Sequence, residues 1–250
     1  MQSTKRIVLA AALSLIGAGA FAQDVNDIIN KNIQAMGGKD KLSKLVSVYE
    51  ENTTSVMGND LNSKVWVLNG QGMRAEVEVM GSTIITVMTK DTGWMVNPMM
   101  GSTDPQPIPV DQLKASASRM DLRGQFLNYA ANGYTATLVG SEAVDGKNNF
   151  KVKLSKEGEG DYVFYIDAAT YYVTKLSASV KVNGSDVTSD IAFSDYKTTP
   201  DGYVFPFTTT INNPQAGGEI VNKITKVVPN QPIDPSAFKS TSALTPPQKS

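Results

Sequence analysis

The spacing of apolar residues changes once along this chain, from a helical period near the N-terminus to alternation over most of the remaining length. Apolar residues recur every three or four positions over residues 25–36. Asp24 can cap this helix and Gly37-Gly38 can end it. A second short helix is expected over 39–46. From Ser47 onward, apolar and polar residues alternate in short runs, which is typical of β-strands.

The strands are expected in two runs and number ten to twelve. Asn69-Gly70, Asp145-Gly146, Asn183-Gly184 and Asp201-Gly202 are hairpin signals, because these residue types tolerate the left-handed backbone that tight turns require. Regular strands with such turns between them indicate one large antiparallel sheet. The candidate strands are 46–56, 62–69, 73–80, 83–90, 93–97, 134–142, 148–156, 161–167, 171–183, 186–196, 203–211 and 219–228.

The segment between the two runs combines a proline-rich part with a helical pattern. Residues 98–109 are expected to form a loop, because the prolines within them remove the hydrogen-bond donors of a sheet ladder. The apolar spacing over residues 110–131 predicts a helix that Arg123-Gly124 can divide in two. The polar stretch 239–250 is predicted to be a disordered tail.

Together these elements predict a mainly β fold with a few helices, of the α+β class. We expect a single strongly curved antiparallel sheet, an incomplete β-barrel of about 10–12 strands capped by helices. Residues 23–238 form one domain, since no linker or internal repeat divides them. A curled sheet of this size has a concave face, and the helices are the elements that can plug it.

The N-terminus has the features of a secretory signal peptide over residues 1–22. Lys5 and Arg6 precede an apolar run, and Ala20-Phe21-Ala22 provides small residues at a cleavage site. The run is too short to cross about 30 Å of hydrocarbon. Removal of the leader changes the formal charge from −1 to −3. The sequence therefore predicts an exported, soluble protein that binds no nucleic acid.

The composition argues against catalysis. The chain has no histidine and no cysteine, so the usual base, nucleophile and zinc ligands are missing. Carboxylates could still form an acid–base pair, but Glu76 and Glu78 alternate with the apolar residues of their strand and are expected in solvent. We therefore predict no catalytic residue, no metal ligand and no cofactor, and we keep a carboxylate-dependent hydrolase as a minor alternative.

Eight of the ten methionines lie between Met57 and Met120. Methionine adapts to irregular apolar partners, so such a cluster is typical either of a deformable ligand cavity or of ordinary core packing. Trp94 could likewise stand at a cavity mouth or anchor the core, and the apolar residues of 110–131 could form a lid or a core stripe. The candidate cavity lining is Ile84, Met88, Trp94, Met95, Met99, Met100, Leu113, Met120, Leu122 and Phe126.

Several short strings, in order along the chain, resemble those of one known family. The chain resembles the periplasmic outer-membrane lipoprotein carrier and receptor superfamily (LolA/LolB-like), in particular its outer membrane lipoprotein-sorting protein branch. The resemblance covers about residues 25–238. The strings that carry it are Ala35-Met-Gly-Gly-Lys39, Lys64-Val-Trp-Val67, Gly93-Trp-Met-Val-Asn-Pro98, Leu138-Val-Gly-Ser-Glu142, Tyr165-Ile-Asp167 and Asp201-Gly-Tyr-Val-Phe-Pro206.

The resemblance implies an incomplete antiparallel barrel capped by helices, with an apolar cavity that takes up acyl chains. One part of the family pattern is missing. The carrier has an Arg-Pro pair after the strand that matches Trp66-Val67, and that arginine latches the helical lid. Leu68-Asn69-Gly70 stands there instead, so the carrier's opening and closing cycle does not transfer to this chain.

Three functions remain open from the sequence. The first is an exported, non-enzymatic carrier or chaperone that binds acyl chains of a lipid or lipoprotein, driven by hydrocarbon burial. The second is a module with a filled core that binds another envelope protein. The third is the hydrolase named above. We expect a monomer whose partners are lipid or lipoprotein acyl chains, with inner- and outer-membrane envelope proteins as possible donors and acceptors.

Overall fold

The computed structural model describes residues 24–110, 113, 120–157, 160–182, 185–213, 218–244 and 246. The predicted signal peptide and the Asn183-Gly184 turn lie outside these residues. Within them, no helix is both long and apolar enough to cross a lipid bilayer.

Two helices precede the sheet, α1 (Val25–Ala35) and α2 (Lys39–Leu42), as the sequence predicts. The Asp24 side chain caps α1 by accepting a hydrogen bond from the Asn26 amide at 3.0 Å. Gly37 and Gly38 follow with φ of 113° and 89°, a region that glycine adopts without strain. These two glycines turn the chain between the helices.

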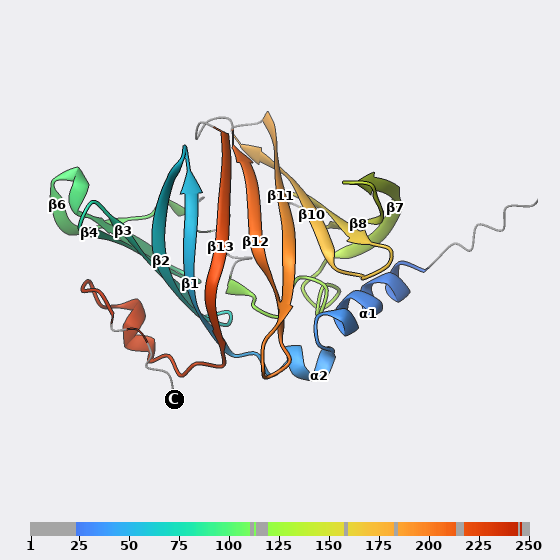
Figure 1. Cartoon of the computed structure of the whole chain (residues 1–250), viewed down its shortest axis with the longest axis horizontal. Coiled ribbons are helices and arrows are strands. Elements are labelled where there is room, and N and C mark those ends of the chain that lie inside the picture. The colour runs from blue at the N-terminus through green and yellow to red at the C-terminus, as the bar shows by residue number, and fades with distance from the viewer. Residues whose placement is uncertain are drawn as a thin grey trace, which may run out of the picture.

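In the described part of the chain, thirteen strands form one antiparallel sheet (Figure 1). The sequence predicts twelve of them closely. The thirteenth, β6, falls in the segment expected to be a loop. The strands are β1 (Ser47–Val56), β2 (Asn59–Leu68), β3 (Gly72–Val79), β4 (Ser82–Thr89), β5 (Gly93–Asn97), β6 (Ser102–Pro107), β7 (Thr135–Val144), β8 (Lys147–Ser155), β9 (Asp161–Asp167), β10 (Val173–Val182), β11 (Ser185–Thr198), β12 (Val204–Asn213) and β13 (Gly218–Pro229).

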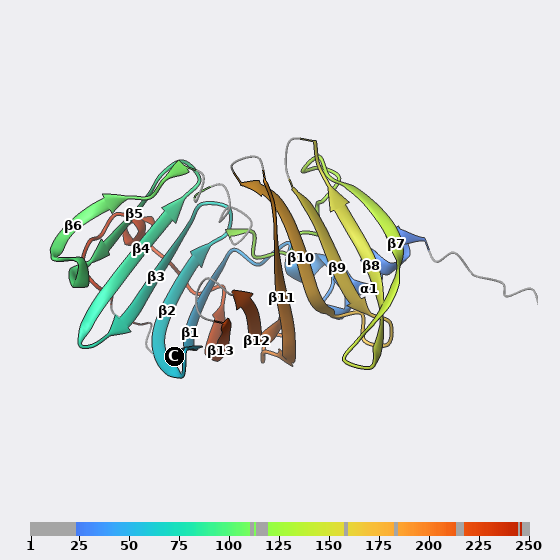
Figure 2. The ribbon, with the colours of Figure 1, turned by 90° about the horizontal axis from the view of Figure 1, so that it is seen from above.

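The sheet consists of two meanders, β1 to β6 and β7 to β13. They are joined where the first strand, β1, pairs with the last strand, β13. The strand order is β6-β5-β4-β3-β2-β1-β13-β12-β11-β10-β9-β8-β7, so every neighbouring pair is consecutive in sequence except β1 and β13. Seen from above, the strands follow a curve from β6 to β7, and these two strands are its free edges (Figure 2). The predicted fold class, an open curved sheet with few helices, is confirmed.

The prolines of β6 explain why the loop prediction is wrong there. Proline lacks an amide donor, so it is disfavoured where both sides of a strand are paired but tolerated at an edge. β6 is an edge strand that pairs on one side only, with Trp94 opposite Pro107 and Met95 opposite Gln106.

The helix predicted over 110–131 is also wrong for residues 121–131, which form a series of turns that continues to residue 133. Gly124 has a φ of 82°, outside the helical region, and its amide donates to the carbonyl of Asp121, three residues back, at 3.5 Å. Residues 111, 112 and 114–119 lie outside the described part of the chain. The apolar residues that suggested a helix here instead pack against the sheet from an irregular segment.

The two faces of the sheet are covered by different parts of the chain. Val48, Val67 and Met73 are cross-strand neighbours on one face, where α1, α2 and the turns of residues 121–133 also pack; we call this the helix-covered face. On β3 and β4 the opposite face is covered by the C-terminal segment, which begins with the 3₁₀ helix η4 (Pro235–Phe238). The ring of Phe238 lies so close to Gly72 that a Cβ there would come within 3.1 Å of it.

Candidate functional site

An apolar cavity of about 230 Å³ lies on the helix-covered face. It is bounded by α1 and the chain after α2 on one side, by the turns around Phe126 on another, and by β9 to β12 below. Apolar groups dominate its wall. The lining residues are Asn32, Ile33, Met36, Leu42, Leu45, Leu122, Arg123, Gly124, Gln125, Phe126, Leu127, Phe164, Val173, Phe193, Tyr196, Tyr203, Val204, Phe205 and Pro206.

Hydrogen bonds hold α1 over the cavity at two points. The Asn32 side chain, which is buried, donates to the carbonyl of Tyr171 at 2.7 Å. The Tyr129 hydroxyl donates to the side chain of Asn26 at 2.9 Å. Ile28, Ile29 and Ile33 of the helix are buried against the sheet. The helix is therefore a packed cover.

The turn segment that closes the cavity is tied to the hairpin between β2 and β3. The amide of Leu122 donates to the Asn69 side chain at 2.9 Å, and the amide of Gly70 donates to the carbonyl of Met120 at 2.8 Å. Phe126 then packs on Phe164 with ring centroids 4.6 Å apart. The Leu68-Asn69-Gly70 sequence, which lacks the family's arginine, thus positions the cavity wall through an asparagine.

Two of the ten residues proposed as cavity lining, Leu122 and Phe126, line this cavity. Met88, Leu113 and Met120 instead form a buried cluster with Val67 and Met73. The part of the helix-covered face over β2, β3 and β4 is therefore filled by side chains.

The other five proposed residues also lie away from the cavity. Trp94 packs on the opposite face with Ile85, Val87 and Phe238. Ile84 and Met95 are half-buried on β4 and β5, while Met99 and Met100 are 52% and 75% exposed. The methionine-rich region is therefore mostly core and surface.

The aromatic wall formed by β11, β12 and the turn between them was not anticipated. Phe193, Tyr196, Tyr203 and Phe205 all line the cavity. Burial raises the pKa of the Tyr196 hydroxyl, and this hydroxyl donates to the carbonyl of Val173 at 2.7 Å. The signal in the sequence is the concentration of aromatic residues between 193 and 207.

A buried ion pair occupies the opposite face, at a position where the sequence predicted solvent. Glu76 and Arg74 are 3% and 0% exposed, and Arg74 Nε donates to Glu76 Oε1 at 2.7 Å. The prediction of a solvent-exposed Glu76 is wrong, because residues returning from the far end of the chain cover this face. Glu78, further along the same strand, is exposed as predicted.

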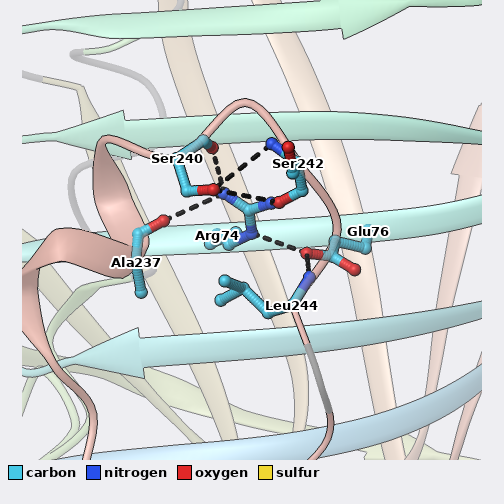
Figure 3. Close-up of polar contacts among 6 residues, drawn as sticks. All are labelled: Arg74, Glu76, Ala237, Ser240, Ser242 and Leu244. Carbon is cyan, nitrogen blue, oxygen red and sulfur yellow. Dashed lines mark hydrogen bonds and ion pairs between the residues drawn. The ribbon is translucent and has the colours of Figure 1, made fainter.

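The C-terminal segment supplies the other hydrogen-bond partners of this ion pair (Figure 3). The Arg74 guanidinium donates to the carbonyls of Ala237 at 2.9 Å and of Ser240 and Ser242 at 2.6 Å each. The amide of Leu244 donates to Glu76 Oε1 at 2.8 Å. Residues 239–244 form no helix or strand, yet these bonds order them, which corrects the disordered-tail prediction for that part. The remaining tail residues, apart from residue 246, lie outside the described part of the chain.

One carboxyl group on the helix-covered face is perturbed. Glu50 is directly paired with Val65 and Val227, and both of these valines pack against the apolar clusters of that face. Burial raises the pKa of the Glu50 carboxyl to about 7, and a hydrogen bond with Asn52 partly opposes the shift. Near neutral pH, Glu50 therefore carries a proton much of the time.

Comparison with solved structures shows which known proteins share this architecture. A LolA superfamily protein from Nitrosomonas europaea matches with a TM-score of 0.58 at 11% identity, over 86% of this chain and 96% of that one. The chain has a LolA-like fold. A domain assigned to the outer membrane lipoprotein-sorting proteins, from Vibrio parahaemolyticus, matches this LolA-like fold with a TM-score of 0.56 at 13% identity, over 85% and 94% of the two chains.

A DUF1329 family protein from Desulfovibrio piger shares the LolA-like fold at a TM-score of 0.56 and 14% identity, over 86% and 96% of the chains. No protein-family model and no curated protein sequence matches this chain. The family resemblance read from the sequence is confirmed at the level of the fold.

Proposed function

We propose that this protein is an exported, non-enzymatic binding protein that shelters an acyl chain of a lipid or lipoprotein in the cavity on the helix-covered face. The observation that carries the proposal is the apolar cavity itself, enclosed by aliphatic and aromatic side chains beneath a packed helix. Export rests on the predicted signal peptide, and the LolA-like fold supports a role in the cell envelope. Inner- and outer-membrane proteins are the partners we expect to donate and receive the ligand.

The cavity volume limits what can be buried. About 230 Å³ corresponds to roughly eight water molecules at liquid density, or a hydrocarbon segment of about as many methylenes. At about 0.8 kcal/mol per methylene, burial contributes roughly 6 kcal/mol before ordering costs, equivalent to a dissociation constant of tens of micromolar. One short chain fills the cavity, so a longer or multiply acylated ligand extends beyond it.

A substitution that fills the cavity tests the proposal. Leu127 is half-buried in the turn segment and lines the cavity, so Leu127→Trp should place an indole in the acyl site. We expect the variant to bind a fluorescent fatty acid about tenfold more weakly than the wild type, a loss of about 1.4 kcal/mol. Leu61→Trp is the matched control, because Leu61 is half-buried on β2 outside the cavity lining.

The delipidated wild-type protein should bind the fluorescent fatty acid saturably, and a diacyl lipid should compete. Absence of saturable binding, or equal binding by both tryptophan variants, would contradict the proposal. Thermal unfolding of the two variants, measured in parallel, separates lost binding from lost folding.

A further inference from the structure

A second, polar cleft adjoins the cavity and is formed by the chain around α2. Its volume is about 720 Å³, and it is open to solvent. Three lysines and two aspartates contribute its charged groups. The lining residues are Gln34, Gly37, Gly38, Lys39, Asp40, Lys41, Lys44, Asp201, Tyr203 and Asn230.

The cleft and the cavity share a wall. Tyr203 lines both, and its hydroxyl accepts a hydrogen bond from the Asn230 side chain at 2.9 Å. The segment 39–45 also serves both sites: Leu42 and Leu45 line the cavity, and three lysines of the same segment line the cleft. The cavity and the cleft are therefore adjacent, with Tyr203 and the segment 39–45 between them.

The three lysines of the cleft have no carboxylate within ion-pair distance among the described residues. Seven lysines elsewhere form ion pairs with aspartate or glutamate, whereas no ion pair in the described part of the chain involves Lys39, Lys41 or Lys44. Lys41 donates to the backbone carbonyl of Asp201, and its ammonium lies 5.6 Å from the centre of the Tyr203 ring. The ammonium of Lys41 therefore stands directly beside the shared wall.

We propose that the cleft binds the anionic headgroup of the amphiphile whose acyl chain occupies the cavity. The ligand class is then a single-chain anionic amphiphile, whose carboxylate or phosphate lies among Lys39, Lys41 and Lys44. Ammonium groups stabilise such oxygens through charge-assisted hydrogen bonds. The cleft supplies an excess of one positive charge over Asp40 and Asp201, in a protein whose formal net charge is −1. This inference rests on the proposed function, because it uses the cavity as the acyl site.

The test compares ligands that share a chain and differ in headgroup. Decanoate, decyl phosphate and 1-decanol are titrated by calorimetry at pH 7.5 into wild type and into Lys39→Gln/Lys44→Gln. Both lysines are exposed, so the double variant should fold. Lys90→Gln/Lys223→Gln is the matched control, since these two lysines are also exposed, line neither site and give the same change in net charge.

We expect the first double variant to bind decanoate and decyl phosphate about three- to tenfold more weakly, as two partly exposed charge contacts would give. Its affinity for 1-decanol should be unchanged, and the control variant should bind all three ligands like the wild type. Raising the salt concentration from 50 to 500 mM should weaken only the anionic ligands.

Three other results would overturn the inference. If both double variants bind decanoate as the wild type does, the cleft is not a headgroup site, although the cavity remains an acyl site. If inorganic phosphate alone binds as tightly as decyl phosphate, the cleft is an anion site independent of the chain. If none of the three amphiphiles binds, the acyl site and the headgroup site fail together.

Discussion

Replacement of Arg74 by methionine tests how the C-terminal segment is held. The guanidinium is fully buried, and it bonds to Glu76 and to three carbonyls of the C-terminal segment. Arg74→Met leaves the Glu76 carboxylate buried without its counter-charge, which costs about 3–5 kcal/mol of unfolding free energy. For a domain of this length, that loss corresponds to a fall in melting temperature of roughly 6–20 °C.

The assay is urea and thermal unfolding followed by circular dichroism, with two comparison variants. Lys64→Met removes an exposed ion pair with Glu78 at 3.1 Å on the same sheet face, and such pairs contribute at most about 1 kcal/mol. Arg74→Met/Glu76→Leu removes both buried charges and should recover part of the lost stability. If Arg74→Met unfolds within about 1 kcal/mol of Lys64→Met, the buried pair does not have the structural role assigned to it here.

Two further predictions concern the same segment and the perturbed carboxyl group. Truncation after Lys239 removes two of the carbonyls that Arg74 bonds and should lower the unfolding free energy by about 2 kcal/mol; hydrogen exchange should become faster in β3. Because the pKa of Glu50 is raised to about 7 in the folded state, the folded state holds this proton more tightly than the unfolded chain. Stability should fall by up to about 3 kcal/mol as pH rises from 4.5 past 7, and Glu50→Gln should remove that part of the pH dependence, measured by urea unfolding at several pH values. A wild-type profile that parallels the Glu50→Gln profile would contradict this prediction.

The regular elements could be predicted from the sequence because their signals are local. Alternation and turn residues indicated twelve strands, and Asp24 and Gly37-Gly38 indicated the limits of α1. β6 was missed because proline removes a hydrogen-bond donor from the ladder and is tolerated mainly at an edge, and the sequence does not say which strand is the edge.

Burial on the second face depends on contacts between distant residues. The alternation of β3 correctly placed Arg74 and Glu76 opposite Met73. The conclusion that this side faces water failed because Phe238 and the following residues return to cover it. The hydrogen bonds of Arg74 and Glu76 to this segment join residues more than 160 positions apart, and no pattern within β3 indicates them.

The position of the cavity was the least predictable feature. Methionine-rich strands and an aromatic-rich pair of strands both supply apolar side chains, and sequence alone does not say which set leaves a space. Met73, Met88 and Met120 fill their half of the helix-covered face, whereas Phe193 and Phe205 border an opening. The difference lies in how the two ends of the sheet are covered, which only the packed structure determines.

Photo-crosslinking with a fatty acid that carries a diazirine on its chain tests the central claim most directly. After irradiation, peptide mass spectrometry locates the attached residues. The account predicts labelling at cavity residues such as Leu127, Phe193 and Phe205, and loss of that labelling in Leu127→Trp. Labelling confined to exposed Met99 and Met100, or scattered over the surface and unchanged by Leu127→Trp, would contradict it.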